Sequence, residues 1–296
     1  MSEYLKMHAQ IETGAGFIAA LDQSGGSTPK ALSLYGVEPD DYSGDTEMFA
    51  AMHDMRARII LADDFTSAKV IGAILFERTM NDTINEIPVA EMLWKTRGVV
   101  PFLKIDKGLE EQSQGVQLMK PMPGLHDVLT TAKSKGIFGT KERSVVHEAD
   151  EAGIAAIVAQ QFEVGADVTK AGLVPILEPE VNIHSTTKAK AENILKDEIL
   201  KKLNELPETS NVMLKLTLPT NAGLYDTLAQ HPRVLRVVAL SGGYSTDEAS
   251  AKLAKNTKMI ASFSRALSEG LNVKMSEAVF NSALGVNIDK IYQASV

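Results

Sequence analysis

The stretch from Asn211 to Thr220, NVMLKLTLPT, places a lysine in the middle of an apolar β-strand. Successive side chains of a strand point to opposite faces, so Lys215 lies on the face opposite a row of aliphatic residues. A buried ammonium group must be paired with an anion or lose its proton, because burying an isolated charge is costly. The residue alone leaves two interpretations open. Its long stem could carry the charge to solvent, or its neutral amine could attack a carbonyl carbon and form a Schiff base.

Seven further apolar runs of strand length flank this stretch, and segments of helix length separate them. Within these segments apolar residues recur every three or four positions, as at Met48, Met52 and Met55. Alternating strands and helices predict parallel strands joined by right-handed crossovers. Eight such units favour a closed (β/α)8 TIM barrel over the alternative, an open doubly wound sheet. The eight predicted strands are 16–21, 70–76, 99–106, 137–141, 173–179, 212–218, 234–240 and 259–264.

The composition is that of an ordinary soluble globular protein, with 44% hydrophobic and 23% charged residues in 296. No Pro-, Gly- or Ser-rich linker divides the chain, so we expect a single barrel domain over residues 1–296. The net charge of −8 disfavours nucleic acid and anionic membranes as partners. The absence of Cys excludes disulfides, and no signal peptide or membrane span is evident, so a cytoplasmic location is predicted. The sequence leaves the oligomeric state open.

Charged residues gather where the predicted strands end. In a barrel of this kind the carboxyl ends of the strands meet at one face, which is where ligands bind. Carboxylates and amines brought together there shift each other's pKa values and can exchange protons during imine formation. Six or more charges at one barrel mouth are difficult to explain as structural ion pairs alone. The residues concerned are Asp22, Lys104, Asp106, Lys141, Arg143, Glu178, Glu180 and Lys215.

Two later stretches predict a phosphate site. The strand at 234–240 leads into LSGGYS, with Ser241, Gly242 and Gly243, and Arg265 follows the last strand. Loops after the seventh and eighth strands of a barrel commonly hold phosphate through backbone N–H groups. The early stretch DQSGGSTPK, with Ser24 and Ser27, also has a phosphate-binding composition but lacks nucleotide-loop spacing.

Metal chemistry receives little support from the sequence. The six His residues are scattered, without a pair at the spacing of metal ligands. No strand leads into the G-x-S-x-G turn of a serine hydrolase either. We therefore predict a reaction without a metal or a bound cofactor, in which any covalent intermediate forms on Lys215.

Taken together, these segments resemble the class I fructose-1,6-bisphosphate aldolases in their short bacterial form. The resemblance covers nearly the whole chain, in the order of that family. It rests on AALDQSGGSTPK, VVPFLKIDKGL, GTKERS, GLVPILEPEV, VMLKLTLPT, VVALSGGYS and ASFSRALS.

The resemblance implies a role for each candidate residue. Lys215 would form the Schiff base, Glu178 would be its general acid and base, and Asp22 would handle the carbinolamine and the substrate hydroxyls. Lys141 would assist charge development near the imine, with Glu180 as a supporting carboxylate. The implied substrate is a phosphosugar, and the implied reaction is the reversible cleavage of fructose 1,6-bisphosphate to dihydroxyacetone phosphate and glyceraldehyde 3-phosphate. The residues expected to bind it are Lys104, Arg143, Ser241, Gly242, Gly243, Arg265, Ser24 and Ser27.

The sequence departs from the animal members of that family at three places. Gln23 stands where they have an acidic residue, and Ser264 where they have glycine. The sequence also ends at Val296 without their tyrosine-ended tail, which leaves open the group that protonates the enamine. Two alternatives remain: another Schiff-base phosphosugar aldolase or a transaldolase, and an inactive barrel that only binds phosphosugars.

Overall fold

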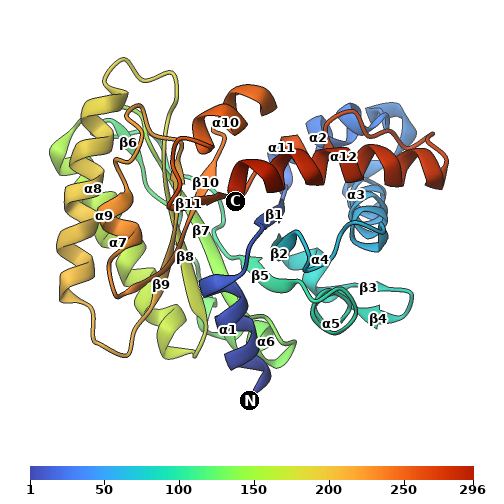
Figure 1. The fold of residues 1–296 in the computed structure, drawn as a ribbon, viewed down its shortest axis with the longest axis horizontal. Helices are drawn as coiled ribbons and strands as arrows, with labels where there is room; N and C mark the ends of the chain where they lie inside the picture. Colours follow the sequence, from blue (N-terminus) through green and yellow to red (C-terminus); the bar gives the residue numbers. More distant parts are fainter.

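Eight parallel strands form the centre of the molecule in a computed structural model that describes residues 1–296. They follow one another in chain order around the sheet, with helices outside them, which confirms the predicted (β/α)8 barrel (Figure 1). The parallel pairing needs crossovers, and these place the helices on the outer face. The barrel strands are β1 (Phe17–Leu21), β2 (Val70–Leu75), β5 (Val100–Lys104), β7 (Gly139–Val146), β8 (Val174–Val181), β9 (Val212–Thr217), β10 (Val234–Leu240) and β11 (Met259–Ala261).

The barrel is closed except at one junction. β1 forms a ladder only with β2, and β11 forms one only with β10. β1 and β11 lie next to each other, but no backbone ladder joins them. We call this junction the seam. Helix α12 (Glu277–Ser295) packs against both strands, and its Ser295 Oγ accepts a hydrogen bond from Ala261 N at 3.0 Å, so this helix takes over part of the missing pairing.

The helices divide between the two sides of the barrel in Figure 1, with α7 and α8 on one side and α2, α3 and α12 on the other. Side-chain caps begin several of them. Asp150 accepts a hydrogen bond from Gly153 N at the start of α7, and Ser276 accepts one from Val279 N at the start of α12. The helices other than α12 are α1 (Glu3–Thr13), α2 (Thr28–Tyr35), α3 (Gly44–Leu61), α4 (Glu77–Asn81), α5 (Val89–Glu91), α6 (Leu125–Ser134), α7 (Glu151–Lys170), α8 (Lys188–Glu205), α9 (Asp226–Ala229), α10 (Thr246–Leu253) and α11 (Arg265–Ser268).

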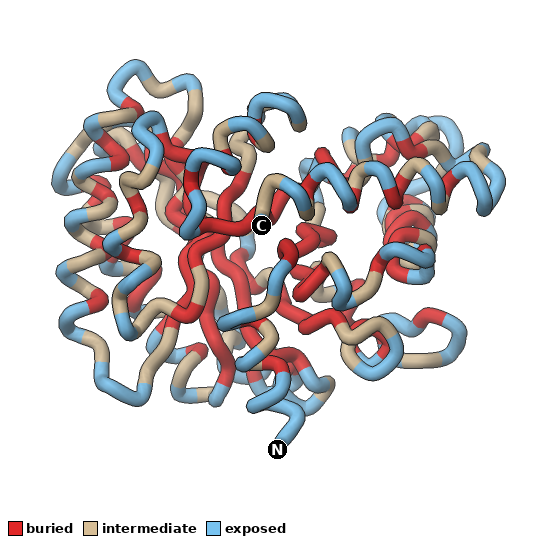
Figure 2. Tube along the Cα trace, in the orientation of Figure 1, coloured by how far each residue is buried: buried red, intermediate tan, exposed pale blue.

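Two apolar layers hold the barrel together, and Figure 2 shows the strands buried throughout while the outer helices expose one face. The larger layer lies between the strands and the helices, where the predicted row Met48, Met52 and Met55 is buried. The smaller layer fills the barrel interior, and α1 contributes Met7 and Ile11 to it. These side chains make the barrel interior a packed core, and α1 covers it at the amino ends of the strands.

Several boundaries differ from the predicted ones. β7 was predicted to end at residue 141 but continues to Val146, because β8 pairs with it over eight residues and the short β6 (Val116–Gln117) adds antiparallel pairs. β11 was predicted to reach residue 264 but ends at Ala261, and the chain turns into α11 instead. A two-residue hairpin of β3 (Thr83–Ile84) and β4 (Ile87–Pro88) lies outside the barrel.

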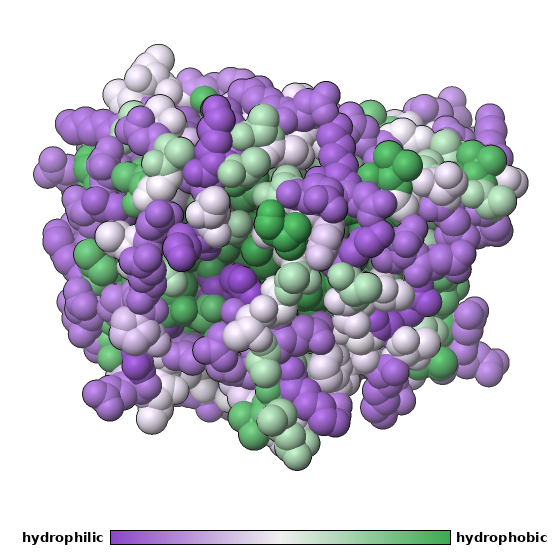
Figure 3. Space-filling model, in the orientation of Figure 1, coloured by the Kyte–Doolittle hydropathy of each residue, from purple (hydrophilic) through white to green (hydrophobic).

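The molecular surface in the view of Figure 3 is mostly hydrophilic, with small separate hydrophobic areas. None of the helices has the length and apolar character that crossing a membrane requires.

Candidate active site

A pocket of about 530 Å³ opens at the carboxyl ends of the barrel strands. All but one of the site residues predicted from the sequence line it, and only Gly243 does not. The pocket lining is dominated by polar and charged side chains, which is the opposite of a typical apolar ligand cavity. The predicted residues that line it are Asp22, Ser24, Ser27, Lys104, Lys141, Arg143, Glu178, Glu180, Lys215, Ser241, Gly242 and Arg265.

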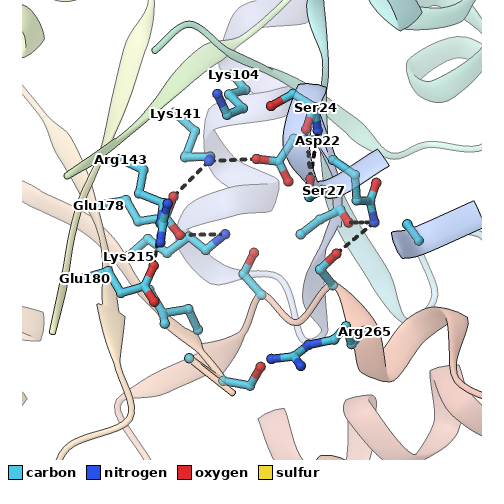
Figure 4. Close-up of a pocket in the computed structure, with 18 of the residues that line it drawn as sticks. Asp22, Ser24, Ser27, Lys104, Lys141, Arg143, Glu178, Glu180, Lys215 and Arg265 are labelled. Atoms are coloured by element: carbon cyan, nitrogen blue, oxygen red, sulfur yellow. Dashed lines mark hydrogen bonds and ion pairs between the residues drawn. The ribbon is translucent and has the colours of Figure 1, made fainter. Parts of the chain in front are cut away.

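Two lysines and two carboxylates meet at the floor of this pocket (Figure 4). Lys215 Nζ lies 3.1 Å from one oxygen of Glu178, and Lys141 Nζ lies 2.9 Å from the other. Lys141 Nζ also lies 2.6 Å from Asp22 Oδ2. Glu178 is therefore shared by both lysines, while Asp22 contacts only Lys141. We call these four side chains the central cluster.

Burial and charge oppose each other in the central cluster. Burial would raise the pKa of Asp22, but the ammonium groups of Lys141 and Lys215 outweigh it and hold this pKa well below its usual range. The same balance lowers the pKa of Glu178. Burial would lower the pKa of Lys141, but Asp22 and Glu178 outweigh it and raise that pKa. Both carboxylates are thus ionised and Lys141 is a fixed cation at neutral pH.

The strand register explains why Glu178 meets Lys215. The ladder between β8 and β9 pairs Ile176 with Met213 and Leu177 with Leu214, and then ends. Glu178 and Lys215 are the next residues on their strands, so they lie where the two strands begin to separate. Beyond them Thr217 Oγ1 accepts a hydrogen bond from the N–H of Val181 at 2.8 Å and donates one to its carbonyl at 2.9 Å. The hydroxyl replaces the lost ladder bonds, which keeps the backbone groups satisfied.

A second row of ion pairs surrounds the central cluster. Arg143 Nε donates to Glu180 Oε2 at 2.5 Å, and Glu180 outweighs burial to raise the pKa of Arg143. Lys104 Nζ donates to Asp106 Oδ1 at 2.6 Å, and the other oxygen of Asp106 accepts from Arg143 N at 3.2 Å. Asp106 thereby joins the strand of Lys104 to the strand of Arg143.

The turn after β10 requires glycine. Gly242 and Gly243 have φ values of +59° and +122°, which side chains with a Cβ rarely adopt. A Cβ at Gly242 would also lie 2.8 Å from Ile183 Cγ2. Arg265 begins α11 next to this turn, and its side chain is exposed and forms no ion pair. An uncompensated guanidinium beside free backbone N–H groups is suited to binding an anion.

Ser24 and Ser27 form a tight turn that also lines the pocket. Ser27 Oγ accepts from Ser24 N at 3.1 Å and donates to Ser24 O at 3.0 Å. Lys30, one helical turn further on, also lines the pocket but was not among the predicted site residues. Ser262 was missed as well, although it follows the inward Ile260 at the two-residue period of a strand. Extending the strand period by one step would have identified Ser262, and including every residue of DQSGGSTPK would have identified Lys30.

No group of three or more His, Asp or Glu side chains in the structure is arranged to hold a metal ion. Among the histidines, His147 lies between Gln117 and Asn182, at 2.8 Å and 3.2 Å, which accounts for both ring nitrogens. This residue is satisfied within the fold.

The arrangement has a definite chemical capacity. A primary amine in contact with a buried carboxylate can add to a carbonyl while the carboxylate transfers protons. Cationic groups lie on both sides of Lys215 in Figure 4, with Lys104 on one side and Arg265 on the other. A ligand with a central carbonyl and an anionic group at each end would match this distribution of charge.

Comparisons with known proteins point to one family. A family model for glycolytic class I fructose-bisphosphate aldolases matches residues 4–224. The chain is 55% identical over 287 residues to "Fructose-bisphosphate aldolase class 1" of Synechocystis sp., covering 97% of this chain and 96% of that protein. It is 53% identical to the protein of the same name from Porphyromonas gingivalis, with 97% of each chain covered.

A solved structure of a similar fold is that of fructose-bisphosphate aldolase from Plasmodium falciparum. Its TM-score is 0.77, and the match covers 99% of this chain and 93% of that one at 19% identity. At this identity the likeness supports the barrel fold alone.

Proposed function

Because this chain belongs to the family of class I fructose-bisphosphate aldolases, we propose that Lys215 is the amine that forms the Schiff base with its substrate. The enzyme is a lyase that reversibly cleaves fructose 1,6-bisphosphate to dihydroxyacetone phosphate and glyceraldehyde 3-phosphate. The observation that supports Lys215 is its contact with Glu178 inside the pocket, at 3.1 Å. Imine formation moves several protons, and a carboxylate in contact with the amine can transfer them. Lys141 is less suited to be this amine, because Asp22 and Glu178 both contact it and hold it as a cation.

In this proposal Glu178 is the general acid and base. It accepts the proton released when the amine adds to the ketone, and it returns a proton to the hydroxyl that leaves as water. The protonated imine then accepts the electron pair of the breaking carbon–carbon bond, while the Glu178 carboxylate accepts the proton of the substrate hydroxyl that becomes the aldehyde carbonyl. Lys141 stabilises negative charge that develops nearby, and Asp22 positions the sugar hydroxyls as an ionised acceptor. Glu180 keeps Arg143 in place through their ion pair.

The two phosphates would occupy opposite ends of the pocket. Arg265 and the backbone of Ser241 to Gly243 form one anion site. Lys104 and Arg143 form the other, and the turn of Ser24 and Ser27 lines the same pocket. This separation would hold the ketone carbon next to Lys215 and would contribute to catalysis through orientation.

Three further features of the proposal follow from the family and the sequence. The reaction needs no metal, so activity should survive prolonged EDTA treatment; loss of activity that Zn²⁺ restores would contradict this. The 296 residues act as one domain. The enzyme works in the cytoplasm, where glycolytic enzymes meet their substrates.

Borohydride trapping tests the proposed amine. The enzyme would be mixed with dihydroxyacetone phosphate, reduced with sodium borohydride, digested and mapped by mass spectrometry. We expect a stable adduct on Lys215, no adduct in a Lys215→Met variant, and loss of turnover in step with labelling. The control is enzyme reduced without substrate, which should remain unmodified. An adduct on Lys141 or Lys104, with Lys215 free, would refute the assignment.

A further inference from the structure

The carboxyl end of the seam is bridged by side chains. Gln23 follows β1 and Ser264 follows β11, and Gln23 Nε2 donates a hydrogen bond to Ser264 Oγ at 2.8 Å. The two residues are 241 positions apart in the chain. Because no backbone ladder joins β1 to β11, this contact links two loops that the sheet itself leaves independent.

A buried arginine fixes the orientation of the Gln23 side chain. Arg56 reaches from α3 and is only 2% exposed. Its Nη2 donates to the backbone oxygen of Gln23 at 2.5 Å and to Gln23 Oε1 at 3.2 Å, while Nη1 donates to Thr79 Oγ1 at 2.7 Å. Guanidinium groups only donate, so the amide oxygen of Gln23 must face Arg56 and its NH2 group must face Ser264.

Arg56 has no carboxylate partner within ion-pair distance, and only neutral oxygens accept its hydrogen bonds. Burial lowers its pKa to about 10, although the nearby charge of Asp22 opposes this. A buried cation held by neutral groups is a costly feature, and it ties α3 to the loop that carries Asp22.

Ser264 directly precedes Arg265, the exposed guanidinium of one proposed anion site, which we take to hold the phosphate of the ketone bound to Lys215. We propose that Gln23 and Arg56 are positioning residues that hold Ser264, and through it Arg265, at a set distance from Lys215. The bridge would thereby determine how strongly the enzyme prefers a ketone that carries a phosphate over the same ketone without one. This inference rests on the proposed roles of Lys215 and Arg265.

The test compares dihydroxyacetone phosphate with dihydroxyacetone, since both present the same ketone to Lys215 and only one can use Arg265. The half-saturating concentration for borohydride labelling is measured for each ketone. Gln23→Met keeps the side-chain length and removes the amide's hydrogen bonds, including those with Ser264 and Arg56, and Ser264→Ala removes the acceptor. In each variant we expect the half-saturating concentration of dihydroxyacetone phosphate to rise about 5- to 10-fold relative to that of dihydroxyacetone, as the loss of one hydrogen bond predicts.

The controls separate positioning from a general loss of structure. Ser264→Thr keeps the hydroxyl and should retain most of the preference for dihydroxyacetone phosphate. The double variant of Gln23→Met and Ser264→Ala should lose no more of that preference than either single variant. Both substitutions lie at the pocket rather than in the core, so the variants should fold, and thermal unfolding would verify this. Equal weakening with both ketones, or an unchanged preference in both single variants, would overturn the inference. Failure of the unaltered enzyme to form an adduct on Lys215 would instead overturn the proposed function.

Discussion

Replacing Lys141 by Met should cost the fold much more than replacing a lysine in a similar pair at the surface. Lys141 Nζ lies 2.6 Å from Asp22 and 2.9 Å from Glu178, and all three side chains are nearly inaccessible to solvent. At an effective dielectric constant of about 20, each of these attractions is worth about 6 kcal/mol. Desolvation of the buried charges offsets much of this attraction, and removing one partner of a buried ion pair typically costs about 3 to 5 kcal/mol, which is the loss we expect in the free energy of unfolding.

The matched control is Lys107→Met. Lys107 Nζ lies 2.7 Å from Glu77, but the two side chains are 43% and 37% exposed. Exposed ion pairs contribute at most about 1 kcal/mol, since water and salt screen them. Urea unfolding of both variants at pH 8 would compare two ion pairs of similar length that differ in burial.

The effect should also depend on pH. Because the pKa values of Asp22 and Glu178 are lowered in the folded enzyme, these residues stabilise it above their unfolded pKa values, near 4, and lose this contribution as the pH falls further. Without the charge of Lys141, less remains to offset the effect of burial on Asp22 and Glu178. Their pKa values rise, and both carboxyls are protonated more readily as the pH falls. The destabilisation should therefore be largest at pH 8 and smaller at pH 4. A loss below about 1 kcal/mol at pH 8, or an equal loss at both pH values, would refute this account of the central cluster.

Three other variants test separate parts of the structure. Glu178→Gln keeps the shape of the side chain but cannot exchange a proton, so turnover should fall about 10²- to 10⁴-fold in the folded variant; a nearly active variant would move the acid–base role elsewhere. Arg265→Ala should weaken binding of the phosphorylated ketose by about 1.5 to 3 kcal/mol, seen in KM, because a hydrogen bond to a charged group is lost; an unchanged KM would place the phosphate away from Arg265. Burial raises the pKa of Glu142 well above its usual value, so the folded enzyme loses stability as the pH rises from that usual value toward the raised pKa. Glu142→Gln should remove this loss and gain stability relative to the unaltered enzyme between pH 5 and pH 9 in urea unfolding, whereas the exposed Glu163→Gln should show no such trend.

The alternation of strands and helices was readable from the sequence because it depends on local periodicity. The two-residue period also placed Lys215 and Glu178 correctly, since it determines which side chains face inward whatever the rest of the chain does. Strand boundaries were less predictable. β7 extends to Val146 only because β8 and β6 offer partners, and a partner strand is not a property of the local sequence.

Helix α8, outside the barrel strands, shows what apolar periodicity fails to predict. The charged stretch 188–208 has apolar residues at the spacing of an amphipathic helix, and α8 does bury Leu195, Ile199 and Leu203. The same spacing gives no reason to bury Lys188 and Glu192, yet both are buried and form an ion pair, and Lys188 Nζ donates to Leu218 O at 2.9 Å. A charge can be buried when a distant segment supplies its partner, and the helix pattern cannot indicate such a segment.

The sequence by itself determined the barrel and the set of charged side chains at its mouth, because both follow from the period of a strand and from the direction of parallel crossovers. Only the tertiary structure decided how those charges pair. Glu178 is shared by Lys141 and Lys215, and Gln23 bridges a seam to a residue 241 positions away. These contacts depend on how far neighbouring strands separate and on which of them form a ladder. Distances of 3 Å between residues far apart in the chain are set by the packing of the whole barrel, and local sequence carries no direct record of it.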